Sequence, residues 1–190
     1  MLLPIYAYGQ PVLKKVAAAI GPDFPDLQEL IANMWETMYH AEGVGLAAPQ
    51  VGHAIRLFVI DTLQIEDDEE DNKLKHQGFK KVFINAQKVE ETGKPWTYEE
   101  GCLSIPRIRG DVERPDTIRL RYMDEHFVEH EEVFTSVNAR VIQHEYDHID
   151  GILFTEKLKP LKKRLIQRKL EDIREGKIKT DYKMKFVVAR

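Results

Sequence analysis

His144, Glu145 and His148 form the pattern His-Glu-x-x-His in the C-terminal part of the chain. On an α-helix, residues four positions apart lie on one face, so both imidazoles can bind a single metal ion. Glu145 projects about 100° around the axis from His144, beside that ion. The alternative interpretations are a satisfied pair of core histidines and a solvated helix face. The combination with a glutamate favours a hydrolytic metal site.

A helix must position these residues, and the flanking sequence predicts one. Thr135 or Ser136 can cap its N-terminus, and Gly151 suits the left-handed position that follows a helix. Val137 and Val141 begin an apolar stripe that His144 and His148 continue. We therefore expect the two histidines to point toward the protein interior.

The third metal ligand is left open by this pattern. The extended zincin motif requires a histidine six residues after His148, but Phe154 occupies that position. Glu171 is a possible downstream carboxylate ligand, although it lies in a segment rich in Lys and Arg. The other possibility is the thiolate of Cys102, the single cysteine. A Cys-His-His set leaves one tetrahedral position open, as catalytic sites require.

The composition is that of one domain, residues 1–190, with 43% hydrophobic residues. No apolar run approaches 18 residues and the N-terminus lacks the features of a signal peptide, so we expect a cytoplasmic protein without membrane contact. A single cysteine excludes an intramolecular disulfide. A reducing compartment would keep that thiol available as a ligand.

Charge is distributed unevenly. The C-terminal helix and tail, about residues 156–190, carry 13 Lys and Arg against five Asp and Glu, although the whole chain has a net charge of −4. Such a basic segment suggests a polyanionic partner such as RNA, or else a solvated helix. Residues 66–71 are consecutive acids inside a predicted surface insertion at about 63–78. Mutual repulsion should keep this insertion out of the core.

The remaining pattern predicts helices and short strands in a definite order. Asp26 can cap a helix that ends near Ala41, and a final helix is expected at 161–174, before an uncertain extension at 177–190. Strands are predicted at 55–60, 82–90, 96–99, 107–114, 117–123 and 127–135. This order favours an α+β fold, with a mostly antiparallel sheet packed around the metal-binding helix and a C-terminal helix outside it.

The segment 43–50 has little side-chain bulk before its last residue, the amide Gln50. Its sequence is Gly-Val-Gly-Leu-Ala-Ala-Pro-Gln. Small residues allow the backbone to approach a ligand closely, and Gln50 then offers a hydrogen-bond donor and acceptor. A tight connection between a helix and a strand would have the same composition. The segment alone does not separate these interpretations.

Three segments together resemble the signature motifs of the bacterial peptide deformylases: GVGLAAPQ at 43–50, EGCLS at 100–104 and QHEYDHIDG at 143–151. The basic C-terminal helix is similar to that of Gram-negative members. Ile149 is a conservative departure, since the family commonly has Leu there. The acidic insertion and the residues after Gly176 match no motif of the family.

The resemblance implies roles for individual residues. Cys102, His144 and His148 would bind the metal, and Glu145 would transfer the proton. Gln50 and the backbone N–H of Leu103 would face the oxygen of the substrate's formyl group. The reaction would release formate from the formyl-methionine of newly made polypeptides.

The same resemblance and the positions beside the motifs suggest the substrate-binding residues Val44, Gly45, Tyr98, Arg109, Val137 and Val141. Imidazole and thiolate suit Zn²⁺, Fe²⁺, Co²⁺ or Ni²⁺, and the family favours Fe²⁺ in the cell with replacement by other metals in preparations. The basic segment would bring the enzyme to the ribosome; no contact with DNA is expected. Two rivals are an HExxH metallopeptidase with a carboxylate ligand and a non-catalytic metal- or RNA-binding protein.

Overall fold

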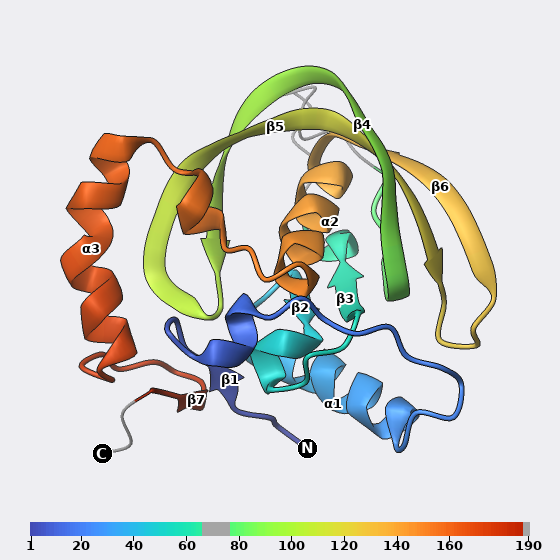
Figure 1. Cartoon of the computed structure of the whole chain (residues 1–190), viewed down its shortest axis with the longest axis horizontal. Helices are drawn as coiled ribbons and strands as arrows, with labels where there is room; N and C mark the ends of the chain where they lie inside the picture. Colours follow the sequence, from blue (N-terminus) through green and yellow to red (C-terminus); the bar gives the residue numbers. More distant parts are fainter. Residues whose placement is uncertain (66–76, 188–190) are drawn as a thin grey trace.

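The computed structural model describes residues 1–65 and 77–187. The acidic run at 66–71 lies outside the described residues. Within them, one antiparallel sheet has the strand order β2-β3-β4-β5-β6 and curves around a helix (Figure 1). Its strands are β2 Gly45–Ala47, β3 Leu57–Asp61, β4 Lys80–Cys102, β5 Ile105–Met123 and β6 Glu129–Thr135. The predicted α+β class is confirmed.

The strands β4 and β5 are longer than the sequence predicted. The stretches expected as two strands each are continuous, and register shifts interrupt the pairing, one of them between Thr92 and Pro95. Pro95 pairs with Pro115 beside that irregularity, because proline is tolerated where a ladder hydrogen bond is missing. The prediction of breaks near residues 91–95 and 115–116 was therefore wrong.

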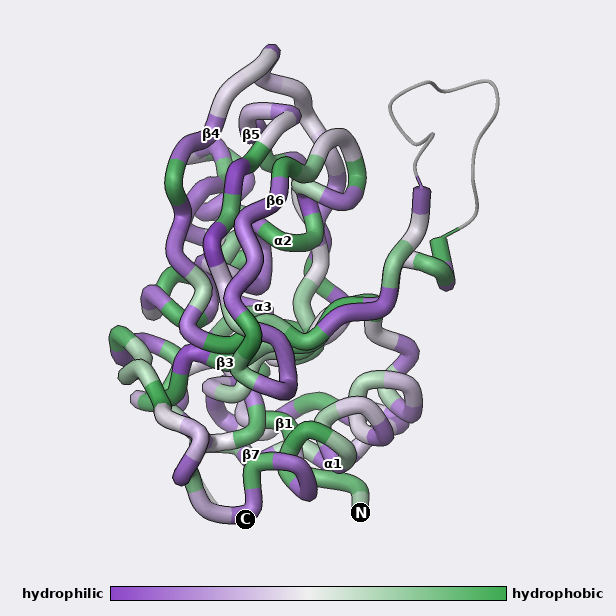
Figure 2. The backbone as a smooth tube through the Cα atoms, turned by 90° about the vertical axis from the view of Figure 1, so that its right-hand side faces the viewer, coloured by the Kyte–Doolittle hydropathy of each residue, from purple (hydrophilic) through white to green (hydrophobic). Residues whose placement is uncertain are grey.

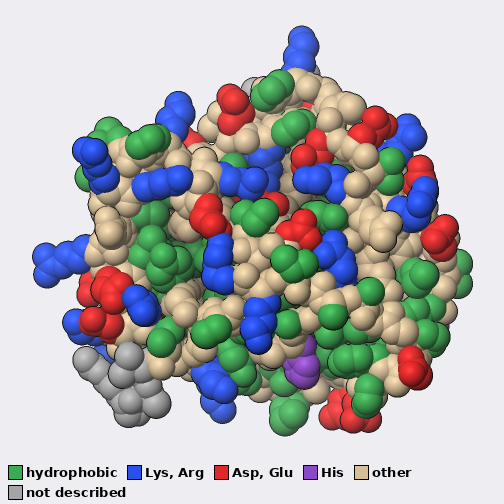
Figure 3. Space-filling view, viewed as in Figure 1, with side chains coloured by type: hydrophobic (Ala, Val, Ile, Leu, Met, Phe, Trp, Pro, Cys, Tyr) green, Lys and Arg blue, Asp and Glu red, His purple; other side chains and the backbone are tan. Residues whose placement is uncertain are grey.

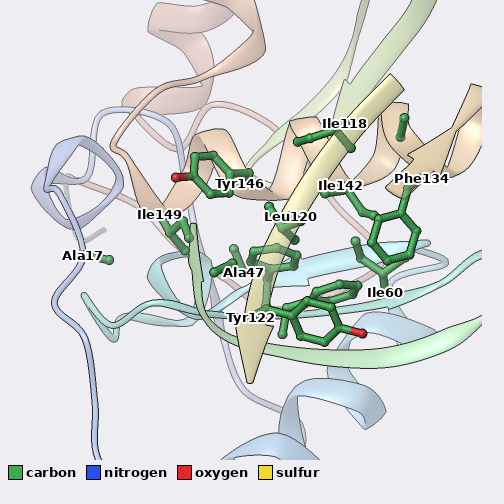
Figure 4. Close-up of a cluster of buried hydrophobic side chains, with 14 residues drawn as sticks. Ala17, Ala47, Ile60, Ile118, Leu120, Tyr122, Phe134, Ile142, Tyr146 and Ile149 are labelled. Carbon is green, nitrogen blue, oxygen red and sulfur yellow. The ribbon is translucent and has the colours of Figure 1, made fainter. Parts of the chain in front are cut away.

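The central helix α2, Ser136–Ile149, lies in the concave face of the curved sheet (Figure 1). Thr135 is at the N-cap position as expected, but its side chain makes no capping hydrogen bond. Gly151 has a φ of 73° just beyond the C-terminus, so its predicted left-handed conformation is confirmed. Aliphatic and aromatic side chains of α2 and β5 pack together between the helix and the sheet (Figure 4).

Two other helices flank this core. The helix α1, Leu27–His40, packs on the β2 and β3 side (Figures 1 and 2), and α3, Pro160–Arg174, packs against β5 at the other side (Figure 1). The short strands β1 Ile5–Tyr6 and β7 Met184–Lys185 pair in parallel, so the first and last strands of the described chain lie side by side (Figure 1). Single-turn helices occupy Pro11–Lys14, Ala48–Val51, Thr62–Gln64 and Phe154–Lys157. In the described part of the chain, none of the helices is long and apolar enough to cross a membrane.

Candidate metal centre

Three potential ligands from two distant parts of the sequence converge beside α2. The ligand atoms of Cys102, His144 and His148 all lie within 4.8 Å of one another. The Cys102 Sγ atom is 3.3 Å from His148 Nε2. Metal–sulfur and metal–nitrogen bonds of about 2.0 to 2.3 Å place ligand atoms at such separations around one ion. The donor set and its spacing therefore fit a single divalent transition metal.

The hairpin between β4 and β5 brings Cys102 to the helix. Cys102 ends β4 and pairs with Ile105, so Leu103 and Ser104 form a two-residue turn between the strands. The long hairpin wraps over α2 (Figure 1), and Cys102 near its tip comes within reach of both histidines. Local helical spacing thus positions two ligands, whereas sheet register positions the third.

A buried carboxylate orients His144. Glu100 Oε1 is 2.9 Å from His144 Nδ1, which leaves His144 Nε2 for the metal. Glu100 also accepts hydrogen bonds from Arg114 at 2.7 and 2.9 Å and from Arg140 at 2.9 Å. Burial raises the pKa of Glu100, but the bonds from His144 and Arg114 outweigh it and hold that pKa well below its usual range. The carboxylate therefore stays ionised behind the histidine.

The roles of Glu100, Arg114, Arg140 and Asp147 were missed by the sequence interpretation. Arg114 links Glu100 to Asp147, whose Oδ2 lies 2.8 Å from Arg114 Nη1. Arg140 is only 1% exposed although it is the largest of the fully buried side chains. The sequence did contain one signal of this network. Arg140 lies one turn before His144 on the inward face of the predicted helix, and a buried charge requires a partner of opposite charge.

Burial also sets the state of the second histidine. Burial lowers the pKa of His148 well below its usual value, and the positive charge of Arg114 acts in the same direction. The neutral imidazole is the form that binds a metal. His148 is 1% exposed, so the ion would be held against the interior wall of the site.

Glu145 is buried beside the ligands without a full set of partners. It is 4% exposed, and its Oε2 atom has no hydrogen-bond partner among the described residues. Burial raises the pKa of Glu145 to about 7. A carboxyl group with such a pKa can both accept and return a proton near neutral pH.

Gln50 is held with its amide nitrogen toward the site. The backbone N–H of Ala47 donates to Gln50 Oε1 at 2.9 Å. The Nε2 atom lies 3.4 Å from Cys102 Sγ and 3.3 Å from Ser104 Oγ. Because its oxygen is occupied by the backbone, Gln50 presents a donor next to the cysteine ligand. The closely packed segment 43–50 thus has a site-building role.

A cleft of about 450 Å³ opens onto these groups. Among the residues that sequence reasoning proposed, its walls include Val44, Gly45, Gln50, Tyr98, Cys102, Leu103, Arg109, Val141, His144 and Glu145. Arg109 lies at the rim, 59% exposed, and its Nε donates to Glu99 at 2.9 Å.

Three other predicted positions lie away from the walls of the cleft. His148 lies behind it, within reach of Cys102. Val137 is fully buried in the core and does not line this cleft, so its predicted substrate contact is not supported. Glu171 is 52% exposed on α3 beside Arg174, which does not suit a metal ligand.

The C-terminal segment contributes to the cleft, which the sequence did not predict. Thr180, Asp181 and Tyr182 are among its lining residues. The stretch 177–190 was expected to be an uncertain extension, and it matches no motif of the family. Its described part, residues 177–187, is held by contacts with the N-terminal strand.

Comparisons with known proteins decide the family. The family model described as polypeptide deformylase matches residues 2–164. The chain belongs to this family. A protein of Flavobacterium johnsoniae named peptide deformylase is 58% identical, covering 100% of this chain and 98% of the relative. One of Salinibacter ruber with the same name is 46% identical, covering 96% and 93%.

Solved deformylase structures have the same fold. The peptide deformylase of Legionella pneumophila superposes with a TM-score of 0.79 at 33% identity, covering 93% of this chain and 98% of that one. The Thermotoga maritima enzyme gives a TM-score of 0.74 at 36% identity, covering 84% and 99%. Membership of the deformylase family confirms the predicted enzyme class, a metal-dependent hydrolase that removes N-formyl groups.

Proposed function

We propose that the chain removes the formyl group from the N-terminal formyl-methionine of newly made polypeptides in the cytoplasm and releases formate. The observation that carries this proposal is the convergence of Cys102, His144 and His148 next to a buried glutamate at the base of one cleft. Cys102 Sγ, His144 Nε2 and His148 Nε2 would hold one divalent transition metal. When bound, such an ion polarises a carbonyl oxygen and makes water a nucleophile at neutral pH.

Glu145 transfers the proton in this proposal. Its buried carboxylate takes a proton from the attacking water and returns it to the departing amine of methionine. Gln50 Nε2 and the backbone N–H of Leu103 donate to the formyl oxygen as negative charge develops there. Each donor of this kind contributes about 3 kcal/mol of transition-state stabilisation.

The peptide would bind along β2. This strand stands at the edge of the sheet, where an extended chain can add as another strand. Gly45 brings its backbone close to Glu145, since a Cβ atom there would meet Glu145 Oε1 at 2.5 Å. Val44, Tyr98 and Val141 supply apolar surface for the methionine side chain, and Arg109 meets the far end of the peptide.

Formate release from a formyl-Met peptide, measured with anaerobic metal analysis, tests this function. Formyl-Met peptides should be cleaved far faster than acetyl-Met peptides, because the acetyl methyl crowds the position beside the metal. Comparable rates would refute the specificity. Family resemblance favours Fe²⁺ in the cell, with Zn²⁺, Ni²⁺ or Co²⁺ in preparations; activity after anaerobic reconstitution with each ion distinguishes them.

A metallopeptidase with a carboxylate ligand is the alternative. Such an enzyme would keep its metal after Cys102→Ala and would cleave internal peptide bonds. The exposure of Glu171 weighs against it. Metal content near one equivalent in Cys102→Ala would mean that the proposed ligand set is wrong.

The ribosome is the proposed partner of α3. Lys162, Lys163 and Lys169 are exposed on this helix, and Lys and Arg side chains gather over it at the left of Figure 3. Basic side chains bind phosphate in a salt-dependent manner. Replacing these three lysines by Gln should weaken ribosome co-sedimentation without slowing small-peptide turnover. Lys94→Gln, at an exposed position of β4, is the control. Unchanged co-sedimentation of the triple variant would refute this partner.

Removal of residues 160–190 is unsuitable for this test. Ile166 and Ile173 of α3 are buried in the core, and the tail lines the cleft. The sequence-based expectation that such a truncation leaves peptide turnover nearly intact therefore conflicts with the structure.

A further inference from the structure

The two-residue turn between β4 and β5 is held from outside by other parts of the chain. Leu103 and Ser104 form this turn. The backbone N–H of Tyr8 donates to Ser104 O at 2.9 Å, and Gln50 Nε2 lies 3.3 Å from Ser104 Oγ. The second residue of the turn is therefore fixed by the N-terminal arm and by the segment that carries Gln50.

The first residue of the turn is held by the C-terminal segment. The Tyr182 hydroxyl donates to the carbonyl oxygen of Leu103 at 2.7 Å. This carbonyl belongs to the peptide unit between the two turn residues, for which the pairing of β4 with β5 provides no partner. The common turn types differ by a rotation of this unit. The Tyr182 hydroxyl therefore fixes the peptide unit that the hairpin itself leaves most free.

Tyr182 can restrain the turn because the segment around it is anchored to the N-terminal arm. The N–H groups of Ile5 and Ala7 donate to two carbonyl oxygens of this segment at 2.9 and 3.0 Å, and β7 lies beside β1 (Figure 1). Gln10 Nε2 donates to Phe186 O at 2.7 Å. The family model ends at residue 164, so the contact with Leu103 comes from beyond the part that it matches.

The restrained turn carries two groups of the proposed reaction. Cys102, directly before the turn, is a proposed metal ligand, and the backbone N–H of Leu103 is a proposed donor to the formyl oxygen. The peptide units before and after Leu103 meet at its Cα atom. Freedom of the second unit therefore also loosens the N–H of the first.

We propose that Tyr182 is a positioning residue, which holds the backbone N–H of Leu103 in the direction of the formyl oxygen through its hydrogen bond to Leu103 O. The C-terminal segment thereby affects the chemical step as well as the wall of the cleft. This inference rests on the proposed deformylase function.

Tyr182→Phe tests the inference, because it removes the hydroxyl and keeps the ring. A net hydrogen bond biases an equilibrium by about two- to tenfold, so kcat for formyl-Met-Ala-Ser should fall about fivefold. The donor acts mainly as negative charge develops on the formyl oxygen. KM and the inhibition constant of the product Met-Ala-Ser should therefore stay within about twofold of the wild type. Metal content should also be retained.

Tyr6→Phe is the matched control. The Tyr6 hydroxyl accepts a hydrogen bond from Lys185 of the same segment at 3.1 Å, and in the described part of the chain it makes no bond to the turn. This variant should keep the wild-type kcat. An equal fall of kcat in both variants would mean that a loosened segment is the cause, and would overturn the role of Tyr182.

Three other results for Tyr182→Phe would also overturn it. These are an unchanged kcat, a raised KM with kcat retained, and a loss of metal, which would assign the bond to Cys102 instead of the donor. Absence of formate release from the wild type would refute the deformylase function itself, so the two failures are distinguishable.

Discussion

Gly45→Ala should impair catalysis through a single methyl group. An added Cβ would lie 2.5 Å from Glu145 Oε1 and 2.8 Å from both Cδ and Cγ of the same side chain. Ordinary contact begins near 3.4 Å, so the carboxylate must move by about 0.9 Å. Rotation of the carboxylate alone does not relieve the clash, because Cγ is also too close. Glu145 is buried, so the space for retreat is small.

A misplacement of about 1 Å costs on the order of 10²-fold in rate when a group must stand in line with a reacting atom. We therefore expect kcat/KM for a formyl-Met peptide to fall about 10²-fold in Gly45→Ala. Metal content should stay near that of the wild type, since the three atoms nearest to the new methyl group all belong to Glu145, which is not a metal ligand. Formate release and metal analysis on the same preparation measure both quantities.

Gly110→Ala is the matched control for this variant. Its Cβ would meet Leu158 Cδ2 at 2.7 Å, the end of a flexible side chain away from Glu145. This variant should keep its rate within a fewfold of the wild type. If Gly45→Ala retained full activity with a normal melting temperature, Glu145 would have room to move, and the tight placement of its carboxylate would not matter for the reaction.

Two further predictions concern stability. Arg114→Met leaves the buried Glu100 and Asp147 carboxylates without their shared cation, so the free energy of unfolding in urea should fall by about 3 to 5 kcal/mol. Arg119 is 44% exposed on the same strand, and Arg119→Met should lower that free energy by under about 1 kcal/mol. Equal losses of unfolding free energy in the two variants would contradict the role of the network. Burial raises the pKa of Glu156, but the hydrogen bond from Lys14 at 2.7 Å outweighs it and lowers that pKa. Because the pKa of Glu156 is lower in the folded state, its carboxylate stabilises the protein above the unfolded-state pKa of 4.5, and this stability is lost as the pH falls through the folded-state pKa. Glu156→Gln should therefore be less stable than the wild type at pH 7 and approach the wild type near pH 3. A difference in unfolding free energy that stays constant with pH would refute this.

The two histidine ligands were predictable from the sequence because their information is local, since His144 and His148 need only a helix. Cys102 lies on a distant strand and was one of two candidates for the third ligand until the family resemblance favoured it. The Glu100 network was not predictable in the same way. It forms only when the register of β4 against β5 brings Arg114 beside Glu100, which lies 14 residues earlier. Pairing of this kind depends on the whole hairpin.

Two elements were misread for identifiable reasons. Pro95 and Pro115 indicated strand ends, yet they face one another at an irregularity within a continuous hairpin. In residues 177–186, charged residues alternate with others that include Ile178, Tyr182, Met184 and Phe186, which is a strand-like pattern, but this pattern does not identify the partner of the segment. Its order comes from β1 and from Tyr182, partners distant in the sequence.

The most direct test of the proposed mechanism is Glu145→Gln, with metal content and deformylation rate measured on one anaerobic preparation. The substitution keeps the shape of the side chain and removes its ability to transfer a proton. Because the carboxylate acts in both proton transfers, the rate should fall toward the upper part of the 10²- to 10⁴-fold range of general acid–base groups, with one metal per chain retained. Full metal content with an unchanged rate would contradict the role assigned to Glu145.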